Sequence, residues 1–206
     1  MEFYAPTKEG EGEITEKRSR FIGRAFPVSS EEEAKLVISR VKAQFRDARH
    51  NPWCYLLPSG KGKSSDDGEP SGTSGAPMLE MIKRENICGI VIVVTRYFGG
   101  VLLGPGGLAR AYTAAAKLAV ENSETALFVT KTCVAVTMPY HLAAKTRHEI
   151  GAFGGTEEQA GYAENVMVTA LFDEENAKRF CENIIEITAG AVIPEMSGEK
   201  LVPAAK

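Results

Sequence analysis

The chain has 206 residues, of which 44% are hydrophobic and 25% are charged. This composition is typical of a soluble globular protein with one large or two small domains. The formal net charge of −3 argues against a protein that coats nucleic acid indiscriminately.

The first half of the chain alternates between strand and helix signals. Alternating side chains predict a strand over residues 12–28. A serine, Ser29 or Ser30, then precedes three acidic residues and an apolar repeat of helical spacing, which predicts a capped helix. The further expected elements are a strand over 52–57, a loop over 58–77, a helix opened by Pro77, a strand buried on both faces over 87–98 and a helix over 106–122.

The second half has a simpler order of elements. They are a strand over 131–140, a helix over 141–153, a hairpin over 155–173, a helix over 174–190 and a last strand from residue 191. This β-α-β-β-α-β order is the ferredoxin-like pattern. We therefore expect an α+β protein with a first domain over residues 1–133 and a second over residues 134–206.

The first part of the chain is more basic than the second. Residues 1–134 carry 18 basic and 16 acidic side chains, whereas residues 135–206 carry 6 and 11. Only the first part is therefore a candidate for binding polyanions.

Compartment can be inferred from cysteine usage and apolar runs. No apolar run approaches the ~20 residues of a membrane span, and the polar, acidic first residues show no signal peptide. The cysteines are far apart and predict reduced, mostly buried thiols; they are Cys54, Cys88, Cys133 and Cys181. We expect a cytoplasmic protein with no membrane partner.

The segment TRYFGGVLLGPGGLARAY, residues 95–112, places five glycines between a predicted strand and a predicted helix. Its spacing matches neither a P-loop nor a dinucleotide fingerprint. Glycines let a ligand approach the backbone, and a helix N-terminus favours an anion. The alternatives are an anion site, for example for RNA phosphate, and a left-handed turn with close helix–strand packing. The residues of the anion site would be Arg96, Tyr97, Gly99, Gly100, Gly104, Gly106, Gly107 and Arg110.

A second unusual stretch is DDGEPSGTSGAP, residues 66–77. Its acidic residues could bind a divalent cation together with a phosphate, and its hydroxyls could bond phosphates or bases. The alternative is an exposed loop built from turn residues, although a loop this long is more often functional or mobile. The binding interpretation rests on Asp66, Asp67, Glu69, Ser71, Thr73 and Ser74.

The histidines give only weak indications of chemistry. His50 could act as a base with Ser71 or Ser74 as nucleophile, but the chain lacks GxSxG and nothing places these residues together. His50 is better interpreted as structural or as an RNA contact. His141 and His148 are too far apart on their predicted helix to form a metal pair, so we expect no metal site.

Aromatic residues flank the glycine segment. Tyr97, Phe98 and Tyr112 could be buried in the core. Aromatic rings beside glycines and arginines also suit stacking with single-stranded bases. The sequence leaves both interpretations open.

Four segments together resemble the YigZ/IMPACT family: FIGRAFPV, DARHN, SDDGEPSGTSGAPML and VVTRYFGGVLLGPGGLARAY. The resemblance covers essentially the whole chain. It implies a first domain similar to the ribosomal-protein and elongation-factor α+β fold and a second similar to the last domain of elongation factor G. One difference from the family, Pro52-Trp53-Cys54-Tyr55 after His50, weakens any role for a thiol beside the histidine.

The resemblance also implies a role in the regulation of translation, in which eukaryotic relatives are implicated through a stress-kinase pathway. We expect a protein that binds RNA or the ribosome rather than an enzyme, and we expect no cofactor. Two alternatives remain. One is an enzyme acting on a phosphorylated or peptide substrate in a cleft of the first domain, and the other is a protein-interaction module without nucleic acid.

Overall fold

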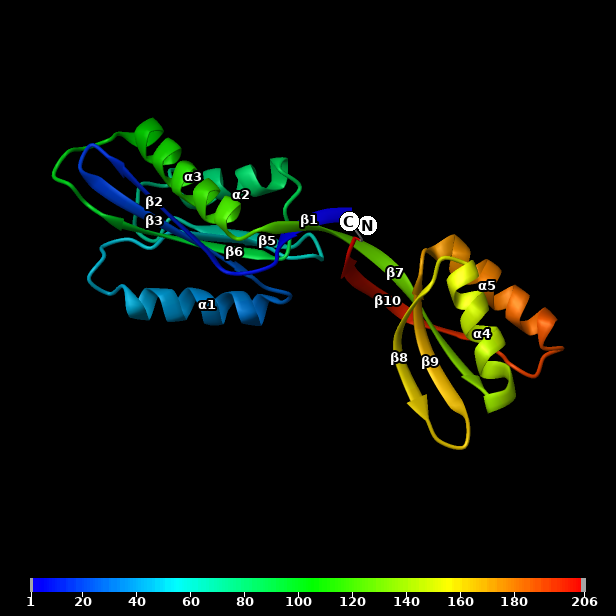
Figure 1. Ribbon diagram of the computed structural model, residues 1–206. Coiled ribbons are helices and arrows are strands. Elements are labelled where there is room, and N and C mark those ends of the chain that lie inside the picture. Colours follow the sequence, from blue (N-terminus) through cyan, green and yellow to red (C-terminus); the bar gives the residue numbers. More distant parts are fainter. Residues whose placement is uncertain (1, 205–206) are drawn as a thin grey trace. The chain divides into compact units, whose positions relative to one another are not determined.

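The computed structural model describes residues 2–204 and has two units (Figure 1). The first unit is Phe3–Leu127, and the second comprises Glu2 and the chain from Phe128 onwards. The division falls within strand β7 (Thr125–Met138), earlier than the expected boundary after residue 133. The expected mixed α+β, two-domain organisation is confirmed.

The first unit is built on a five-stranded antiparallel sheet of order β2-β3-β6-β4-β5. Its strands are β2 (Gly10–Glu16), β3 (Ser19–Pro27), β4 (Trp53–Leu56), β5 (Gly62–Ser65) and β6 (Ile90–Tyr97). The single strand expected over residues 12–28 is wrong. Lys17 and Arg18 have φ values of 45° and 66° and form a tight turn between β2 and β3.

Helices cover both faces of this sheet (Figure 1). They are α1 (Glu31–Gln44) on one face and α2 (Gly75–Arg84) and α3 (Pro105–Asn122) on the other. Ser30 caps α1 as expected, because its Oγ accepts from Glu33 N–H at 3.2 Å. The loop expected over residues 58–77 is wrong at two points, since β5 pairs with β4 and α2 begins at Gly75.

Helix α3 lies directly on the backbone of β2 and β3. A Cβ added at Gly23 would be 2.3 Å from the carbonyl oxygen of Ala115, and one added at Gly10 would be 2.2 Å from that of Ala119. Glycines on the strands and alanines on the helix therefore allow an approach that larger side chains would prevent.

The second unit has the expected ferredoxin-like order β10-β7-β9-β8, with antiparallel neighbours. Besides β7, its elements are β8 (Thr156–Tyr162), β9 (Val166–Phe172), β10 (Glu195–Pro203), α4 (Tyr140–Ala152) and α5 (Glu174–Ile187). Strand β1 (Glu2–Pro6), which the sequence did not predict, also pairs with β7, and its residues from Phe3 onwards belong to the first unit. Phe172, Phe180 and Ile184 are fully buried in the core.

Two further expectations concern membranes and thiols. Within residues 2–204, no helix combines the length and the apolar character that a bilayer crossing requires. All four cysteines are free; Cys54 is buried, whereas the other three are only partly buried. Burial raises the pKa of the Cys54 thiol, which keeps it protonated.

Candidate functional site

Asp66 organises the acidic loop between β5 and α2. Its Oδ1 accepts from Ser74 Oγ at 2.6 Å, Gly75 N–H at 2.9 Å and Ser74 N–H at 3.0 Å, and its Oδ2 accepts from Gly72 N–H at 2.8 Å. Burial alone would raise the pKa of Asp66, but these hydrogen bonds hold it below its usual value. The carboxylate therefore caps α2 across the loop, where the Ser74 side chain makes no cap bond.

We expect Asp66→Ala to lower the free energy of unfolding by about 1–2 kcal/mol at neutral pH, the cost of a lost helix cap. Because the pKa of Asp66 is lowered in the folded state, its contribution is complete above the unfolded pKa and is lost as the pH falls through the folded pKa. Urea unfolding at neutral and acidic pH should show the difference from wild type shrinking in acid. Ser71→Ala, which changes an exposed side chain in the same loop, should have no effect. Equal stability of wild type and Asp66→Ala at pH 7 would contradict this role.

Asp67 and His50 link the acidic loop to the strand side of the unit. Asp67 Oδ2 accepts from Asn51 N–H at 2.8 Å, and Oδ1 pairs with Lys42 Nζ. His50 Nδ1 lies 2.9 Å from the backbone oxygen of Asp67. A carbonyl can only accept, so Nδ1 carries a proton and donates to it, which leaves Nε2 as the other polar atom of the ring.

A buried cluster joins the two motif segments. Glu69 Oε1 accepts from Arg96 Nη1 at 2.7 Å and from Tyr112 Oη at 2.7 Å. Glu69 and Arg96 are each 7% exposed, and Tyr112 is fully buried. Burial and the bond to Glu69 raise the pKa of Tyr112, so its phenol remains a donor. Glu69 of the acidic loop thus holds both Arg96 on β6 and Tyr112 on α3.

This cluster changes what several expected site residues can do. The Arg96 guanidinium faces Glu69 instead of solvent, and Thr73 is buried with its Oγ1 donating to Pro70 O at 2.6 Å. The cation site considered for Asp66, Asp67 and Glu69 is not assembled, since each carboxylate has other partners. Across the described residues, no group of three or more His, Cys, Asp or Glu side chains could hold a metal.

The start of the glycine segment is explained by close packing. A Cβ added at Gly99 would lie 2.0 Å from the backbone carbon of Arg18. Gly99 N–H also donates to Ser19 Oγ at 3.1 Å. The loop after β6 therefore rests on the β2–β3 turn, and the close-packing interpretation accounts for Gly99.

The end of the segment forms an open helix N-terminus. Gly104 caps α3 with a φ of 72° and no side-chain cap bond. A Cβ added at Gly106 would meet only Arg110 Nη1, at 3.6 Å, so no packing constraint requires glycine there. Gly107 has Leu103 Cβ at 3.1 Å from the added atom. Gly106 is thus a glycine of this segment that neither close packing nor a positive φ requires.

The remaining residues expected to form the site are Tyr97, Gly100 and Ser71, and they lie at the end of the sheet where β6 ends. Tyr97 Oη donates to Asp47 Oδ1 at 3.2 Å, with the Arg20 guanidinium carbon 5.9 Å from the ring centroid. Gly100, with a φ of 85°, follows in the loop after β6, and Ser71 is exposed.

Basic side chains without an ion pair are concentrated at this end, where Glu16 and Asp47 also form no ion pair. Most basic side chains of the first unit pair with a carboxylate, for example Arg20 with Glu13 and Arg24 with Glu11. The structure describes every residue from Phe3 to Leu127. The basic side chains in this range that form no ion pair are Lys17, Arg18, Arg46, Arg49, Arg84 and Arg110.

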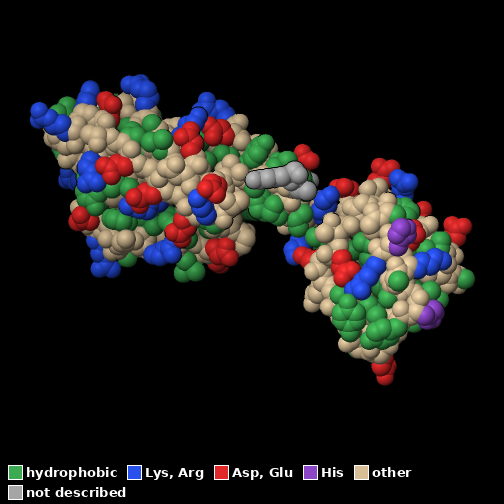
Figure 2. All heavy atoms as spheres, viewed as in Figure 1, with side chains coloured by type: hydrophobic (Ala, Val, Ile, Leu, Met, Phe, Trp, Pro, Cys, Tyr) green, Lys and Arg blue, Asp and Glu red, His purple; other side chains and the backbone are tan. Residues whose placement is uncertain are grey.

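All of these except Arg84 surround the end of β6. Lys17 and Arg18 form the turn against Gly99, and Arg110 lies in the second turn of α3. Arg46 and Arg49 flank Asp47, the partner of Tyr97. We call Lys17, Arg18, Arg46, Arg49 and Arg110 the cationic end; Figure 2 shows Lys and Arg side chains in this part of the first unit.

Of this set, the sequence indicates Arg110 as a site residue, and it places Lys17 and Arg18 on a basic strand face that is either solvated or in contact with phosphate. Charge along the chain does not show which cations are neutralised, because pairing depends on strand register. The signal that was available is the acidic residues on β2, which face arginines on β3: Glu11 opposes Arg24 in the sheet. The turn residues Lys17 and Arg18 have no such partner.

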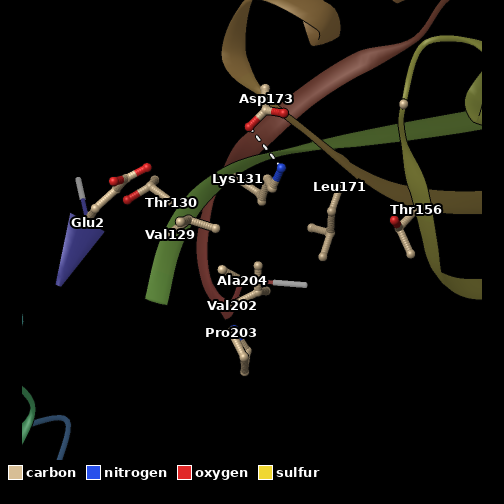
Figure 3. A pocket seen from close by; sticks show the side chains of 11 residues that line it. Glu2, Val129, Thr130, Lys131, Thr156, Leu171, Asp173, Val202, Pro203 and Ala204 are labelled. Atoms are coloured by element: carbon tan, nitrogen blue, oxygen red, sulfur yellow. Dashed lines mark hydrogen bonds and ion pairs between the residues drawn. The ribbon is translucent and has the colours of Figure 1, made fainter. Parts of the chain in front are cut away.

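The second unit contains a separate hollow of about 660 Å³ (Figure 3). Leu171, Val202 and Pro203 form part of its wall. Its basic residue, Lys131, pairs with Asp173 at 2.8 Å. None of the residues expected to form the site lies in this hollow, so the candidate site belongs to the first unit.

Known proteins share both units of this chain. Residues 17–120 match the Impact N-terminal domain, and residues 136–191 match a domain of unknown function, DUF1949. The chain belongs to the IMPACT family. The family member YvyE of Bacillus subtilis is 34% identical over 190 residues, which cover 91% of this chain and 88% of YvyE.

Other relatives match this IMPACT-family chain over most of its length or over about half of it. YigZ of Escherichia coli is 30% identical over 85% of this chain and 88% of its own. Protein IMPACT of Homo sapiens is 29% identical over 119 residues, covering 54% of this chain and 37% of that protein. A crystal structure described as that of a hypothetical protein, 26% identical, matches with a TM-score of 0.65 over 100% of this chain and 98% of its own.

Proposed function

We propose that this IMPACT-family protein binds RNA, free or in the ribosome, through the cationic end, and thereby takes part in the regulation of translation. The observation that carries the proposal is the location of the unpaired cations. Elsewhere in the first unit basic side chains are paired, with the exception of Arg84, whereas five remain unpaired around the end of β6. Exposed, unpaired cations gathered on one surface are the usual electrostatic footprint of a polyanion-binding protein.

Part of the cationic end and the neighbouring helix N-terminus would bind the phosphates of the RNA. Lys17, Arg18 and Arg110 would contact phosphates, together with the open N-terminus of α3 at Gly106. A hollow of about 270 Å³ beside Arg110 lies between α3 and the end of β2, where Glu16 also lines it. Phosphate contacts of this kind give affinity without reading sequence.

The buried cluster would act as support. Glu69, Arg96 and Tyr112 are too enclosed to meet an RNA backbone, and they would fix the positions of the two loops. His50 Nε2 and the exposed Ser71 hydroxyl would be available for bonds to sugar or base. The resemblance of the first unit to a family implicated in translation supports RNA as the anion.

Filter binding of the full chain to single-stranded and hairpin RNA, over a range of salt concentrations, tests the proposal. We expect affinity to fall as salt rises. The triple variant Lys17→Ala, Arg18→Ala, Arg110→Ala should reduce the magnitude of the log–log salt slope by about 2 for single strands. Arg84→Ala, which removes the unpaired arginine outside the cationic end, is the matched control and should leave affinity and slope unchanged.

Two results would count against this function. One is RNA binding that does not weaken with salt, and the other is an equal loss of affinity in the triple variant and in Arg84→Ala. Co-sedimentation with ribosomes before and after RNase treatment then separates RNA contacts from protein contacts. A partner that the triple variant still binds after RNase would favour a protein-interaction module.

A further inference from the structure

Phe98 is a large aromatic side chain that the fold leaves in solvent. It follows β6 directly and is 53% exposed. Single exposed apolar residues are common on protein surfaces and need no explanation by themselves. The surroundings of this ring are what distinguish it.

The ring is held from one side. The guanidinium carbon of Arg96 lies over the Phe98 ring, 5.5 Å from its centroid. Arg96 is itself fixed by its bond of 2.7 Å to Glu69 and is 7% exposed. Phe98 therefore rests on a buried, immobilised cation, which reduces the conformational entropy that a ligand would have to remove on binding.

The ring also lies among the cations of the proposed RNA site. The next residue, Gly99, packs against the backbone of Arg18 in the β2–β3 turn. The loop then continues to the N-terminus of α3 and Arg110. An exposed ring bordered by unpaired cations is the arrangement by which proteins bind single-stranded nucleic acid, with bases stacked on the ring and phosphates on the cations.

A duplex cannot use this arrangement along its length. Its bases are stacked on one another, so their faces are closed to a side chain, and only phosphates and groove edges are available. Unpaired nucleotides in loops, bulges and single strands present a free face.

We infer that the cationic end takes unpaired nucleotides of RNA and that Phe98 stacks on one of their bases. The inference rests on the RNA binding proposed above and specifies the class of RNA. Arg96 then supports the stacking ring and does not contact phosphate, and this role agrees with its burial.

The test uses the full chain, an oligouridine 12-mer and a blunt RNA duplex with the same number of phosphates. Phe98→Leu keeps an apolar side chain without an aromatic face, and Phe98→Trp keeps the face. Leu102→Ala changes another exposed apolar residue of the same loop, 81% exposed, and is the matched control. A single 2-aminopurine in the 12-mer reports stacking through quenching of its fluorescence.

We expect Phe98→Leu to weaken oligouridine binding about 5- to 100-fold, the usual effect of losing one stacked base, with the salt slope unchanged. Quenching should be lost with it, and Phe98→Trp should retain both. Leu102→Ala should match wild type. Urea midpoints equal to that of wild type would show that the variants are folded.

Three results would overturn the inference. If Phe98→Leu binds like wild type while the cation triple variant does not, RNA binding stands and stacking fails. If Leu102→Ala loses as much as Phe98→Leu, the loop makes a general apolar contact, as a protein partner would. If wild type binds neither RNA, the inference and the proposed function both fail.

Discussion

Glu69→Ala is expected to lower the free energy of unfolding of the first unit by about 3–5 kcal/mol, the typical cost of removing one partner of a buried ion pair. The variant would leave the Arg96 guanidinium buried without a counter-charge and the Tyr112 hydroxyl without its acceptor. Trp53 on β4 is the only tryptophan of the chain, so its fluorescence during urea unfolding reports this unit.

Two comparisons identify the cause of the loss. Glu13→Ala breaks the exposed pair with Arg20 and should cost less than about 1 kcal/mol. Glu69→Leu combined with Arg96→Met removes both charges and should recover much of the stability, because apolar residues often replace a buried pair without loss. Similar losses in Glu69→Ala and Glu13→Ala would show that burial of the pair is unimportant.

Gly23→Ala is expected to destabilise the first unit by about 3 kcal/mol or more, at the upper end of the range for overpacking. The new methyl group would lie 2.3 Å from the Ala115 carbonyl oxygen, so α3 would have to move away from β3. Separation of α3 from the sheet also disturbs Tyr112, and the same urea titration measures the combined effect.

Gly106→Ala is the matched control in the same unit. Its methyl group would meet only Arg110 Nη1, at 3.6 Å, and alanine favours a helix more than glycine does. We therefore expect unchanged or slightly raised stability. If both substitutions are tolerated equally, close packing of α3 on the strand backbone is not what requires Gly23.

The sequence predicted the second unit well and the edges of the first unit poorly. Hydrophobic periodicity is strong in the strands and helices of a ferredoxin-like core, so their order could be derived. Strand β5 was missed because it is a short, polar edge strand, GKSS. The β2–β3 turn was missed because Lys17 and Arg18 adopt positive φ, a conformation that usually selects glycine or asparagine.

The candidate site was predicted as two motifs but not as a set of contacts. The glycines and the acidic loop could be found from composition alone. The pairing of Glu69 with Arg96 could not, because these residues are 27 positions apart in the chain and meet only through the fold. The cationic end could not be derived from the sequence for the same reason, because the fold decides which of the other basic residues form ion pairs.

The shared carboxylate oxygen of Glu69 also has a dynamic consequence. Because Oε1 accepts from both Arg96 and Tyr112, withdrawal of the acidic loop breaks both hydrogen bonds at once. It also leaves the buried Arg96 guanidinium without a counter-charge. Opening the loop and loosening the α3 side of the cluster are therefore one cooperative event instead of two independent fluctuations. Amide hydrogen exchange in the two segments should accordingly follow a common opening free energy.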